Sequence, residues 1–358
     1  MTASDHPPAP GGADDDGAQA PEPRVRETHA LVVGREAMAC RFEVVFNAGE
    51  VADATALGMT ALDLVDEIEA RISVYRETSE LSRLNARAHE GWQPVSADLL
   101  DLLVRARDLH ARTGGAFDPA SGSLVRVWGF LRRQGRVPDP ATLAAALRAS
   151  GMDGVEIDAH AARVRFTKPG VEINPGAIGK GWALDRVVEG LRASGVPSVL
   201  VHGGSSSVRA AGVQGPAFPG RRGWRVGVSH PLRPGRRLAT VTLVERALGT
   251  SGSGTQFFVD RGRRLGHILD PRSGIPAEGV LSATVIAPDA ATADALSTAL
   301  YVLGPAGIAT VAPAGGDVAA ILVVPSRSAS SVRVLTANLD PELFECTAGE
   351  GVELVRAG

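Results

Sequence analysis

The amino-acid sequence predicts an α+β fold in which mixed sheets pack against helices. Segments with helical periodicity and segments with strand character are interleaved along the 358 residues. They do not follow the regular strand–helix–strand rhythm of a doubly wound sheet, which favours α+β over α/β. Hydrophobic residues make up 44% of the chain and charged residues 22%, which is typical of a globular protein. A chain of this length has ample residues for a sizeable core.

The first segment, residues 1–26, predicts a disordered acidic tail. It is rich in proline, glycine and aspartate and has almost no large apolar side chain, so it cannot bury enough surface to offset its chain entropy. It also lacks a basic start followed by an apolar run, so we expect no signal peptide. No later stretch reaches about 18 uninterrupted apolar residues, so we expect no membrane span. The sequence as written therefore predicts a cytoplasmic protein with one ordered domain over residues 27–358.

The amino-terminal half of that domain predicts two strands followed by helices. Residues 31–34 and 41–46 have the side-chain pattern of strands. Residues 51–68 have an apolar stripe at helical spacing. Further helices are predicted at 97–111 and 140–149, and short strands at 155–157 and 164–167.

The segment 174–185 is glycine-rich and opens a helix that we expect to run to about residue 193. It includes Lys180, one of only two lysines among 37 basic residues. A compact ammonium can touch a single phosphate oxygen in a narrow pocket where a planar guanidinium would not fit. Glycines also let backbone approach a ligand closely before a helix begins. A glycine-rich helix start with a surface lysine is the alternative, and this segment alone does not decide between them.

The rest of the chain predicts a series of strands and one more helix. The helix, residues 290–302, directly follows a strand at 280–286. The other strands are predicted at 198–202, 224–228, 238–244, 256–259, 318–324 and 332–336.

Two segments in the amino-terminal half have candidate binding residues. Tyr75, one of only two tyrosines, lies in a polar, irregular stretch after the first helix. Its ring could stack on a planar cofactor or cap the core. Asp118 precedes Pro119, which favours an extended backbone and leaves its carboxylate free to accept hydrogen bonds from a ligand or from nearby backbone.

Two segments in the carboxy-terminal half have candidate catalytic and metal-binding residues. His267 lies close to Asp270 and Arg272, and a histidine can take up or return a proton near neutral pH. Asp294 and Thr298 are four residues apart on a predicted helix, so their hard oxygen atoms share one face and suit magnesium. A structural histidine and an exposed helix acid are the alternatives. The small and apolar residues around Asp294 disfavour a solvated face.

The composition disfavours several classes of partner and site. The formal net charge is −3 and the arginines are scattered, so nothing favours nucleic acid as a partner. Cys40 and Cys346 lie near opposite ends of the chain without Cys-x-x-Cys spacing. This arrangement argues against a zinc site or a disulfide framework.

The five segments around Tyr75, Asp118, Lys180, His267 and Asp294, in this order, resemble the ApbE family, the FAD:protein FMN transferases. The resemblance covers about residues 38–304 and implies that family's T-fold-like arrangement of mixed sheets and packed helices. The matching strings are residues 73–75 with 79–85, 115–118 with 128–130, 176–185, 202–204, 267–274, and 293–298 with 303–304.

The resemblance implies a reaction and a set of site residues. In the family, FAD is cleaved at its pyrophosphate, FMN is esterified to a threonine or serine of an acceptor flavoprotein, and AMP leaves. By position, His267 would help to activate the attacking hydroxyl. Asp294, also implied in catalysis, would bind Mg²⁺ with Thr298 and the backbone carbonyl of Ala177. The residues implied to bind FAD are Met38, Tyr75, Ala116, Phe117, Asp118, Asn174, Lys180 and Leu269.

The sequence differs from the family pattern at a few positions near that site. Asn174 stands where the family usually has aspartate, and Ser205 replaces the aspartate that usually follows the paired glycines. Ala39 and Cys40 replace the usual glycine and threonine after Met38. The segment 250–254 lacks the tyrosine and arginine expected soon after its Ser-Gly. These differences bear on FAD affinity and on recognition of the acceptor.

Two alternatives to the transferase stay open at this point. One is an FAD pyrophosphatase in which water replaces the acceptor, so that FMN and AMP are released. The other is a non-catalytic relative that only binds FAD. Many family members act outside the cytoplasm behind a lipoprotein or signal sequence, so an extracytoplasmic location follows if the true start differs from the one given.

Overall fold

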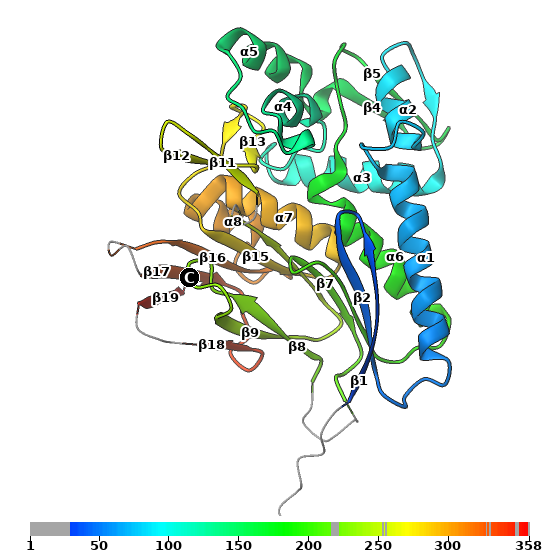
Figure 1. The fold of residues 1–358 in the computed structure, drawn as a ribbon, viewed down its shortest axis with the longest axis vertical. Coiled ribbons are helices and arrows are strands. Elements are labelled where there is room, and N and C mark those ends of the chain that lie inside the picture. The colour runs from blue at the N-terminus through cyan, green and yellow to red at the C-terminus, as the bar shows by residue number, and fades with distance from the viewer. Residues whose placement is uncertain are drawn as a thin grey trace, which may run out of the picture.

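The computed structural model describes residues 29–215, 222–252, 254, 256–326, 328, 331–347 and 351–356. Figure 1 shows sheets in the lower part of the molecule, helix α7 (Ala290–Leu303) lying across them, and shorter helices above it. The α+β prediction is therefore confirmed, with mixed helices and sheets. The predicted tail, residues 1–26, lies outside the described residues.

The main sheet has nine strands in the order β1-β2-β6-β7-β10-β15-β16-β17-β19. All neighbouring strands are antiparallel except β17 and β19, which are parallel. The strands are β1 (Ala30–Ala37), β2 (Cys40–Asn47), β6 (Val199–Gly203), β7 (Ser207–Ala211), β10 (Ala247–Ser251), β15 (Ser282–Ala287), β16 (Ala319–Pro325), β17 (Val332–Ala337) and β19 (Val352–Arg356).

A smaller sheet covers one face of the main sheet. It has the order β18-β9-β8, formed by β8 (Trp224–Ser229), β9 (Arg237–Leu243) and β18 (Phe344–Cys346). Val208 and Leu248 of the main sheet pack in one buried cluster with Trp224 and Val241 of the small sheet. Side chains alternate along a strand, so Ser207, next to Val208, faces the opposite side.

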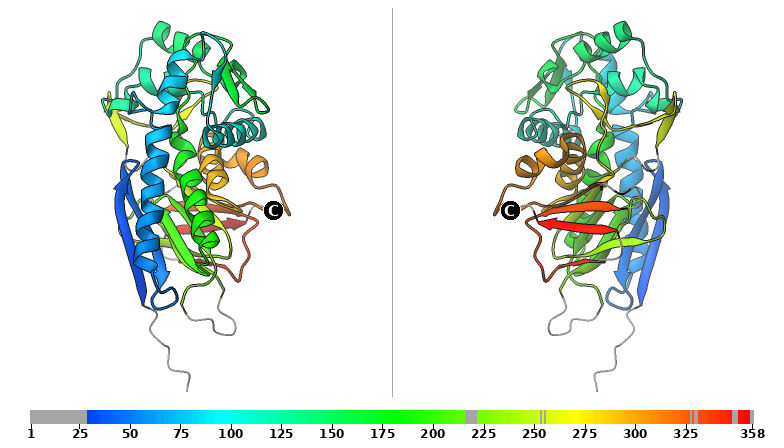
Figure 2. Two further views of the ribbon diagram at one scale, coloured as in Figure 1. Left: turned by 90° about the vertical axis from the view of Figure 1, so that its right-hand side faces the viewer. Right: turned by 90° about the vertical axis from the view of Figure 1, so that its left-hand side faces the viewer.

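Three helices cover the other face of the main sheet. They are α1 (Ala54–Ile72), α6 (Gly179–Ala193) and α7; α6 contacts both α1 and α7, and α3 (Ala97–Arg112) packs on α7. Figure 2 shows α1 running alongside the β1-β2 hairpin. The large buried cluster on this side includes Phe42 and Val44 of the sheet with Leu62, Trp182 and Leu296 of the helices.

A region of short elements lies beyond the ends of the strands. Its helices are α2 (Glu80–Arg87), α4 (Gly122–Val127) and α5 (Pro140–Ala149), with the 3₁₀ turns η1 (Phe130–Arg132), η2 (Met152–Gly154) and η3 (Pro175–Ala177). The turn η4 (Gly304–Gly307) and helix α8 (Ile308–Val311) follow α7 and pack against it. Its strands are β3 (Gln93–Pro94), β4 (Val155–Asp158), β5 (Arg163–Phe166), β11 (Phe257–Asp260), β12 (Arg263–Gly266), β13 (Leu269–Asp270) and β14 (Ile275–Pro276). The pairs β11-β12 and β13-β14 form two hairpins.

The sequence predictions missed several elements and misplaced several boundaries. The first helix begins at Ala54, so Val51 lies outside it. The stretch around Tyr75, predicted as irregular, includes α2, whose N-cap Ser79 accepts from the Ser82 amide at 2.9 Å. Strands β7 and β10 were missed because small and polar residues fill them, where a strand pattern needs β-branched or aromatic side chains.

One helical stretch, Ala290–Val311, is long and apolar enough to pass a test for a membrane span, with mean hydropathy 1.2. The share of that window buried inside the fold is 61%. The stretch supplies α7 and α8, and α7 packs on β10, β15 and α6. Its apolar character therefore follows from its place in the core, and it is weak evidence for a membrane span.

Candidate active site

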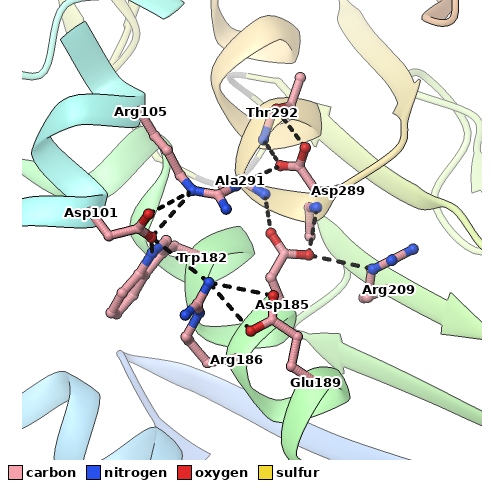
Figure 3. Close-up of polar contacts among 11 residues, drawn as sticks. Asp101, Arg105, Trp182, Asp185, Arg186, Glu189, Arg209, Asp289, Ala291 and Thr292 are labelled. Atoms are coloured by element: carbon pink, nitrogen blue, oxygen red, sulfur yellow. Dashed lines mark hydrogen bonds and ion pairs between the residues drawn. The ribbon is translucent and has the colours of Figure 1, made fainter. Parts of the chain in front are cut away.

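The start of α7 is held by a buried carboxylate from α6. Asp185 accepts hydrogen bonds from the Ala290 amide at 2.8 Å and the Ala291 amide at 2.9 Å, and Arg209 Nε lies 3.4 Å from the same side chain (Figure 3). Burial raises the pKa of Asp185 to about 7 in spite of these contacts. Asp185 thus caps the first amides of α7 and fixes that helix against α6.

Helix α3 is tied into the same network. Asp101 accepts from Trp182 Nε1 at 2.8 Å and pairs with Arg105 at 3.2 Å (Figure 3). Arg105 in turn lies 3.9 Å from Asp289, the N-cap residue of α7. The three helices α3, α6 and α7 are therefore held at one junction by charged and polar contacts.

Two glycines allow backbone to approach α7 closely. A Cβ atom at Gly181 would lie 2.0 Å from the carbonyl oxygen of Ala290. A Cβ atom at Gly249, on β10, would lie 2.5 Å from the carbonyl carbon of Ala293 and 2.7 Å from the amide of Asp294. Only glycine fits where two backbones lie this close. Asp294 consequently sits where α7 touches both α6 and β10.

Asp294 is a buried carboxylate with defined partners. Its side chain accepts from the Gly181 amide at 2.8 Å and from Ser207 Oγ at 2.8 and 3.0 Å. Only 8% of the residue is exposed, and burial raises the pKa of Asp294 to about 6, while the positive charge of Lys180 acts in the opposite direction. The exposed helix acid considered from the sequence is therefore wrong.

Thr298 lies one turn further along α7, as its spacing predicts. Its hydroxyl is 3.2 Å from the carbonyl oxygen of Asp294 and 3.0 Å from the hydroxyl of Ser251. Ser251 also lies 2.8 Å from Ser297. Ala177 ends η3, which packs against α7 just before α6 begins. The structure thus brings the three predicted magnesium ligands to neighbouring positions around α7.

Lys180 is half-buried in the first turn of α6, and its ammonium donates to Ser206 Oγ at 2.8 Å. Ser206 Oγ lies 3.5 Å from Ser207 Oγ, which donates to Asp294. Two hydroxyls therefore link the lysine to the aspartate. The surface-lysine alternative is wrong.

His267 lies between the two hairpins, and its ring is held against backbone. Nδ1 is 3.0 Å from the carbonyl oxygen of Gln256. Burial lowers the pKa of His267 from its ordinary value of 6.5, and the charge of Lys180 lowers it further. The positive charge of Lys180 therefore acts on the pKa of both His267 and Asp294.

Two predicted FAD-binding residues are placed toward solvent or at a turn. Tyr75 is 71% exposed, so the core-capping alternative is wrong and its ring is available to a ligand. Met38 lies in the β1-β2 turn, where Met38 and Ala39 both adopt positive φ values of 47° and 60°. Glu69 accepts from the Met38 amide at 2.9 Å and so fixes this turn.

Four other predicted FAD-binding residues have side chains turned into the protein. Ala116, Phe117 and Leu269 are buried, with 0%, 1% and 7% of each residue exposed. Asp118 accepts from the Ala120 amide at 2.8 Å and the Met152 amide at 3.3 Å, and His110 lies 3.5 Å away. Burial raises the pKa of Asp118. Its carboxylate therefore accepts hydrogen bonds from backbone amides of the protein.

Asn174 caps the short turn that precedes α6. Its side-chain oxygen accepts from the Gly176 amide at 3.0 Å, and its own amide donates to the Pro119 carbonyl at 2.7 Å. The second contact connects η3 to the segment that follows Asp118. An asparagine oxygen can make this cap as well as an aspartate oxygen can.

Sequence reasoning missed the serines around Asp294. Ser206, Ser207 and Ser251 lie at strand ends and each contacts a predicted site residue. The three consecutive serines after Gly204 are the sequence feature that could have indicated these contacts, because they place several hydroxyls in one short turn. Their contacts depend on strand pairing, because Ser207 lies opposite Gly249 across β7 and β10.

A hollow of about 450 Å³ lies beside His267. It is bounded on one side by Ala39 of the β1-β2 turn and on the other by Phe130 and Gln256, both of which contact His267. A larger hollow of about 560 Å³ has walls from both hairpins and Trp128, but it is lined by none of the predicted site residues. The hollow beside His267 is the one that adjoins the candidate active site.

The chain is similar to proteins of one family over most of its length. A model of the ApbE family matches residues 38–322. The FAD:protein FMN transferase of Treponema pallidum is 34% identical over 299 residues, which cover 78% of this chain and 80% of that protein. The FAD:protein FMN transferase of Haemophilus influenzae is 31% identical over 250 residues, covering 67% of this chain and 70% of that protein.

Solved structures that resemble this chain belong to the same family. The crystal structure of the ApbE protein from Thermotoga maritima has a TM-score of 0.74 at 31% identity and covers 83% of this chain and 94% of that chain. The apo form of the flavinyl transferase ApbE from Pseudomonas stutzeri has a TM-score of 0.76 at 29% identity, covering 90% of this chain and 98% of that chain. The chain therefore belongs to the ApbE family of flavin transferases.

Proposed function

We propose that this enzyme transfers FMN from FAD to a threonine or serine hydroxyl of an acceptor flavoprotein, with Mg²⁺, and releases AMP. The observation that carries the proposal is the buried Asp294, linked through Ser207 and Ser206 to Lys180. A carboxylate and an ammonium in one buried site suit a pyrophosphate with its counterion. The names of the relatives, FAD:protein FMN transferases, support the same substrate.

The donor set at Asp294 fits magnesium. It combines one carboxylate, the hydroxyl of Thr298 and the backbone carbonyl of Ala177, all of them hard oxygen donors. The described part of the chain has no group of three or more His, Cys, Asp or Glu side chains that could hold a metal. A site with few protein ligands is what Mg²⁺ uses when substrate phosphates and waters complete its shell. When bound there, Mg²⁺ would neutralise charge on the pyrophosphate.

The proposed reaction breaks a phosphoanhydride bond of FAD and forms a phosphate ester bond to the acceptor. The acceptor oxygen bonds to the phosphorus of the FMN half, and the bond from that phosphorus to the bridging oxygen breaks. The bridging oxygen leaves with AMP, and the hydroxyl proton passes to His267. Lys180 binds a phosphate oxygen as a compact point charge. His267 stays neutral near pH 7 because burial lowers its pKa, so it is ready to accept that proton.

One incubation separates the three candidate activities. The protein is mixed with FAD, Mg²⁺ and an acceptor flavoprotein domain, and AMP, free FMN and protein-bound FMN are measured. We expect AMP and bound FMN in equal amounts. Free FMN with AMP would instead identify a pyrophosphatase, and tight FAD binding without turnover would identify a binding protein. A chain that does not bind FAD would contradict the proposal at its first step.

Replacing Lys180 by arginine is expected to weaken FAD binding although the charge is kept. The guanidinium is larger and planar, so it would lose the Ser206 contact and crowd the phosphate. A hydrogen bond to a charged group contributes about 1.5–3 kcal/mol, which corresponds to an increase in Kd of roughly 10-fold or more. Fluorescence titration with FAD measures this change.

Lys168→Arg is the matched control, since Lys168 is the only other lysine. Its ammonium donates to the Ser150 carbonyl at 2.7 Å, away from Asp294. We expect that variant to bind FAD as the wild type does. Equal affinities for wild type, Lys180→Arg and Lys168→Arg would contradict the assignment of Lys180 to the phosphates.

The activity is expected to fall at acid pH with a midpoint below 6.5. His267 acts as a base only when it is neutral, and a lowered pKa keeps it neutral down to a more acid pH than an ordinary histidine. Rates are therefore flat near neutral pH and decline as the pH drops through the lowered pKa. Initial rates from about pH 5 to pH 8 with saturating Mg²⁺ test this. A midpoint above 6.5, or an unchanged acid limb in His267→Gln, would contradict it.

A further inference from the structure

The ring of His267 is held by contacts from two separate segments. The carbonyl oxygen of Gln256 accepts from the backbone amide of His267 at 3.3 Å and lies 3.0 Å from its Nδ1. On another side, the Phe130 ring and the imidazole form a T-shaped pair, with ring centroids 6.5 Å apart and planes at 73°. These contacts therefore hold both the backbone and the side chain of His267.

Gln256 also binds the segment that supplies the aromatic contact. Its side-chain Nε2 donates to the carbonyl oxygen of Phe130 at 3.2 Å. Phe130 is one of three packed rings, with Phe258 at 5.7 Å and Trp128 at 6.4 Å between centroids. Trp128 Nε1 donates in turn to the carbonyl of Gly274 at 2.8 Å. The support behind the imidazole is therefore a rigid cluster that spans η1, β11 and the β13-β14 hairpin.

The partner of Nδ1 determines the chemistry of the opposite nitrogen. A carbonyl oxygen can only accept, so Nδ1 has to be the protonated nitrogen of the neutral ring. The lone pair is then on Nε2. A histidine whose other nitrogen is bound to a carbonyl is held in one tautomer and one orientation. Phe130 and Gln256, which both contact His267, also line the hollow of about 450 Å³.

We propose that Gln256 and Phe130 are positioning residues, which hold His267 with its proton on Nδ1 and so present the Nε2 lone pair to the acceptor hydroxyl. This inference rests on the proposed function, because it takes His267 as the base of the transfer reaction. Neither residue touches the reacting atoms. Gln256 acts through its backbone carbonyl on Nδ1 and through its side chain on Phe130, and Phe130 restricts rotation of the ring.

The tautomer of His267 can be measured without substrate. The eight histidines of the chain are labelled with ¹⁵N, and the signals of His267 are assigned by their loss in His267→Gln. The ring nitrogen shifts show which nitrogen has the proton. We expect the Nδ1–H form in the wild type, whereas free imidazole side chains in water favour Nε2–H. Wild-type His267 in the Nε2–H form would overturn the proposal even if FMN transfer is observed.

Two variants loosen the support, and each has a matched control. Gln256→Leu removes the hydrogen bond to the Phe130 carbonyl, and Phe130→Leu removes the T-shaped ring contact with His267. We expect both to give a mixture of tautomers and to lower kcat about 10-fold, with little change in the KM for FAD. The control for Gln256→Leu is Gln93→Leu, which removes a side-chain amide on β3. The control for Phe130→Leu is Phe166→Leu, which removes an aromatic ring on β5; Phe166 and Phe130 are both 5% exposed.

The outcomes separate this inference from the proposed function. If the controls lose as much kcat as Gln256→Leu and Phe130→Leu, the effect is general destabilisation and the positioning role is wrong. If the tautomer shifts in the variants but kcat is unchanged, the positioning role in catalysis is also wrong. If wild-type His267 has the Nδ1–H form but His267→Gln keeps full transfer activity, it is the assignment of His267 as base that fails.

Discussion

Replacing Asp294 by asparagine is expected to remove most Mg²⁺-dependent turnover while the fold stays intact. An asparagine can accept from the Gly181 amide with its oxygen and donate to Ser207 with its nitrogen, so no buried group loses its partner. The negative charge, however, is gone. Loss of one preorganised electrostatic group typically lowers turnover by about 10²–10³-fold. AMP release at saturating FAD and Mg²⁺ measures the loss, and Mg²⁺ affinity should fall as well.

Asp185→Asn is the matched control for that experiment. Asp185 is the other buried carboxylate at the junction of α6 and α7, but both of its oxygens accept from backbone amides. An asparagine has one acceptor oxygen, so one amide of α7 is left unpaired at a cost of about 1–3 kcal/mol. We expect a lower unfolding temperature with turnover within a few-fold of the wild type. Full activity in Asp294→Asn would contradict the metal assignment.

Replacing Gly181 by alanine is expected to lower both stability and turnover. The added methyl group would lie 2.0 Å from the carbonyl oxygen of Ala290, and neither backbone can move aside without separating α6 from α7. Overpacking of this kind typically costs about 1–3 kcal/mol, occasionally more. Separation of the helices would also move the Gly181 amide away from Asp294. Denaturant unfolding and AMP release measure the two effects.

Gly190→Ala on the same helix is the control. A Cβ atom at Gly190 would have no heavy atom within 4 Å, so only the helix propensity changes. Alanine is the better helix former, and we expect stability to rise by about 0.5–1 kcal/mol with no change in turnover. If Gly181→Ala were stabilised to the same degree, the close approach of α6 and α7 would be wrong.

The sequence was sufficient for the fold class and for contacts set by local geometry. Asp294 and Thr298 lie one turn apart on α7 because helical spacing requires it. Lys180 lies in the first turn of α6, directly after the glycine-rich turn η3 that Asn174 caps. Each of these positions depends on residues within one turn, so a local pattern predicts it.

Contacts that depend on strand pairing and helix packing could not be predicted in this way. Ser207 meets Asp294, 87 residues later, because β7 pairs with β10 and α7 lies across both strands. Gln256 meets Phe130 across 126 residues of chain. For Asp118 the sequence left a ligand and nearby backbone as alternatives, and the amide of Met152 that also holds its carboxylate comes from another segment. A periodic pattern in the sequence predicts only local contacts, so it does not indicate which residues meet over such distances along the chain.

The two glycines beside α7 have a consequence for engineering this enzyme toward new acceptors. At Gly181 and Gly249 the backbone packs directly against the backbone of α7. The position of Asp294 is therefore set at these two points by backbone contacts, which substitutions at other residues in a library leave in place. The β1-β2 turn and the β11-β12 hairpin, by contrast, border the hollow beside His267 with side chains such as Ala39 and Phe257. Randomising these two rims, with both glycines kept, should change which acceptors are modified without displacing the carboxylate.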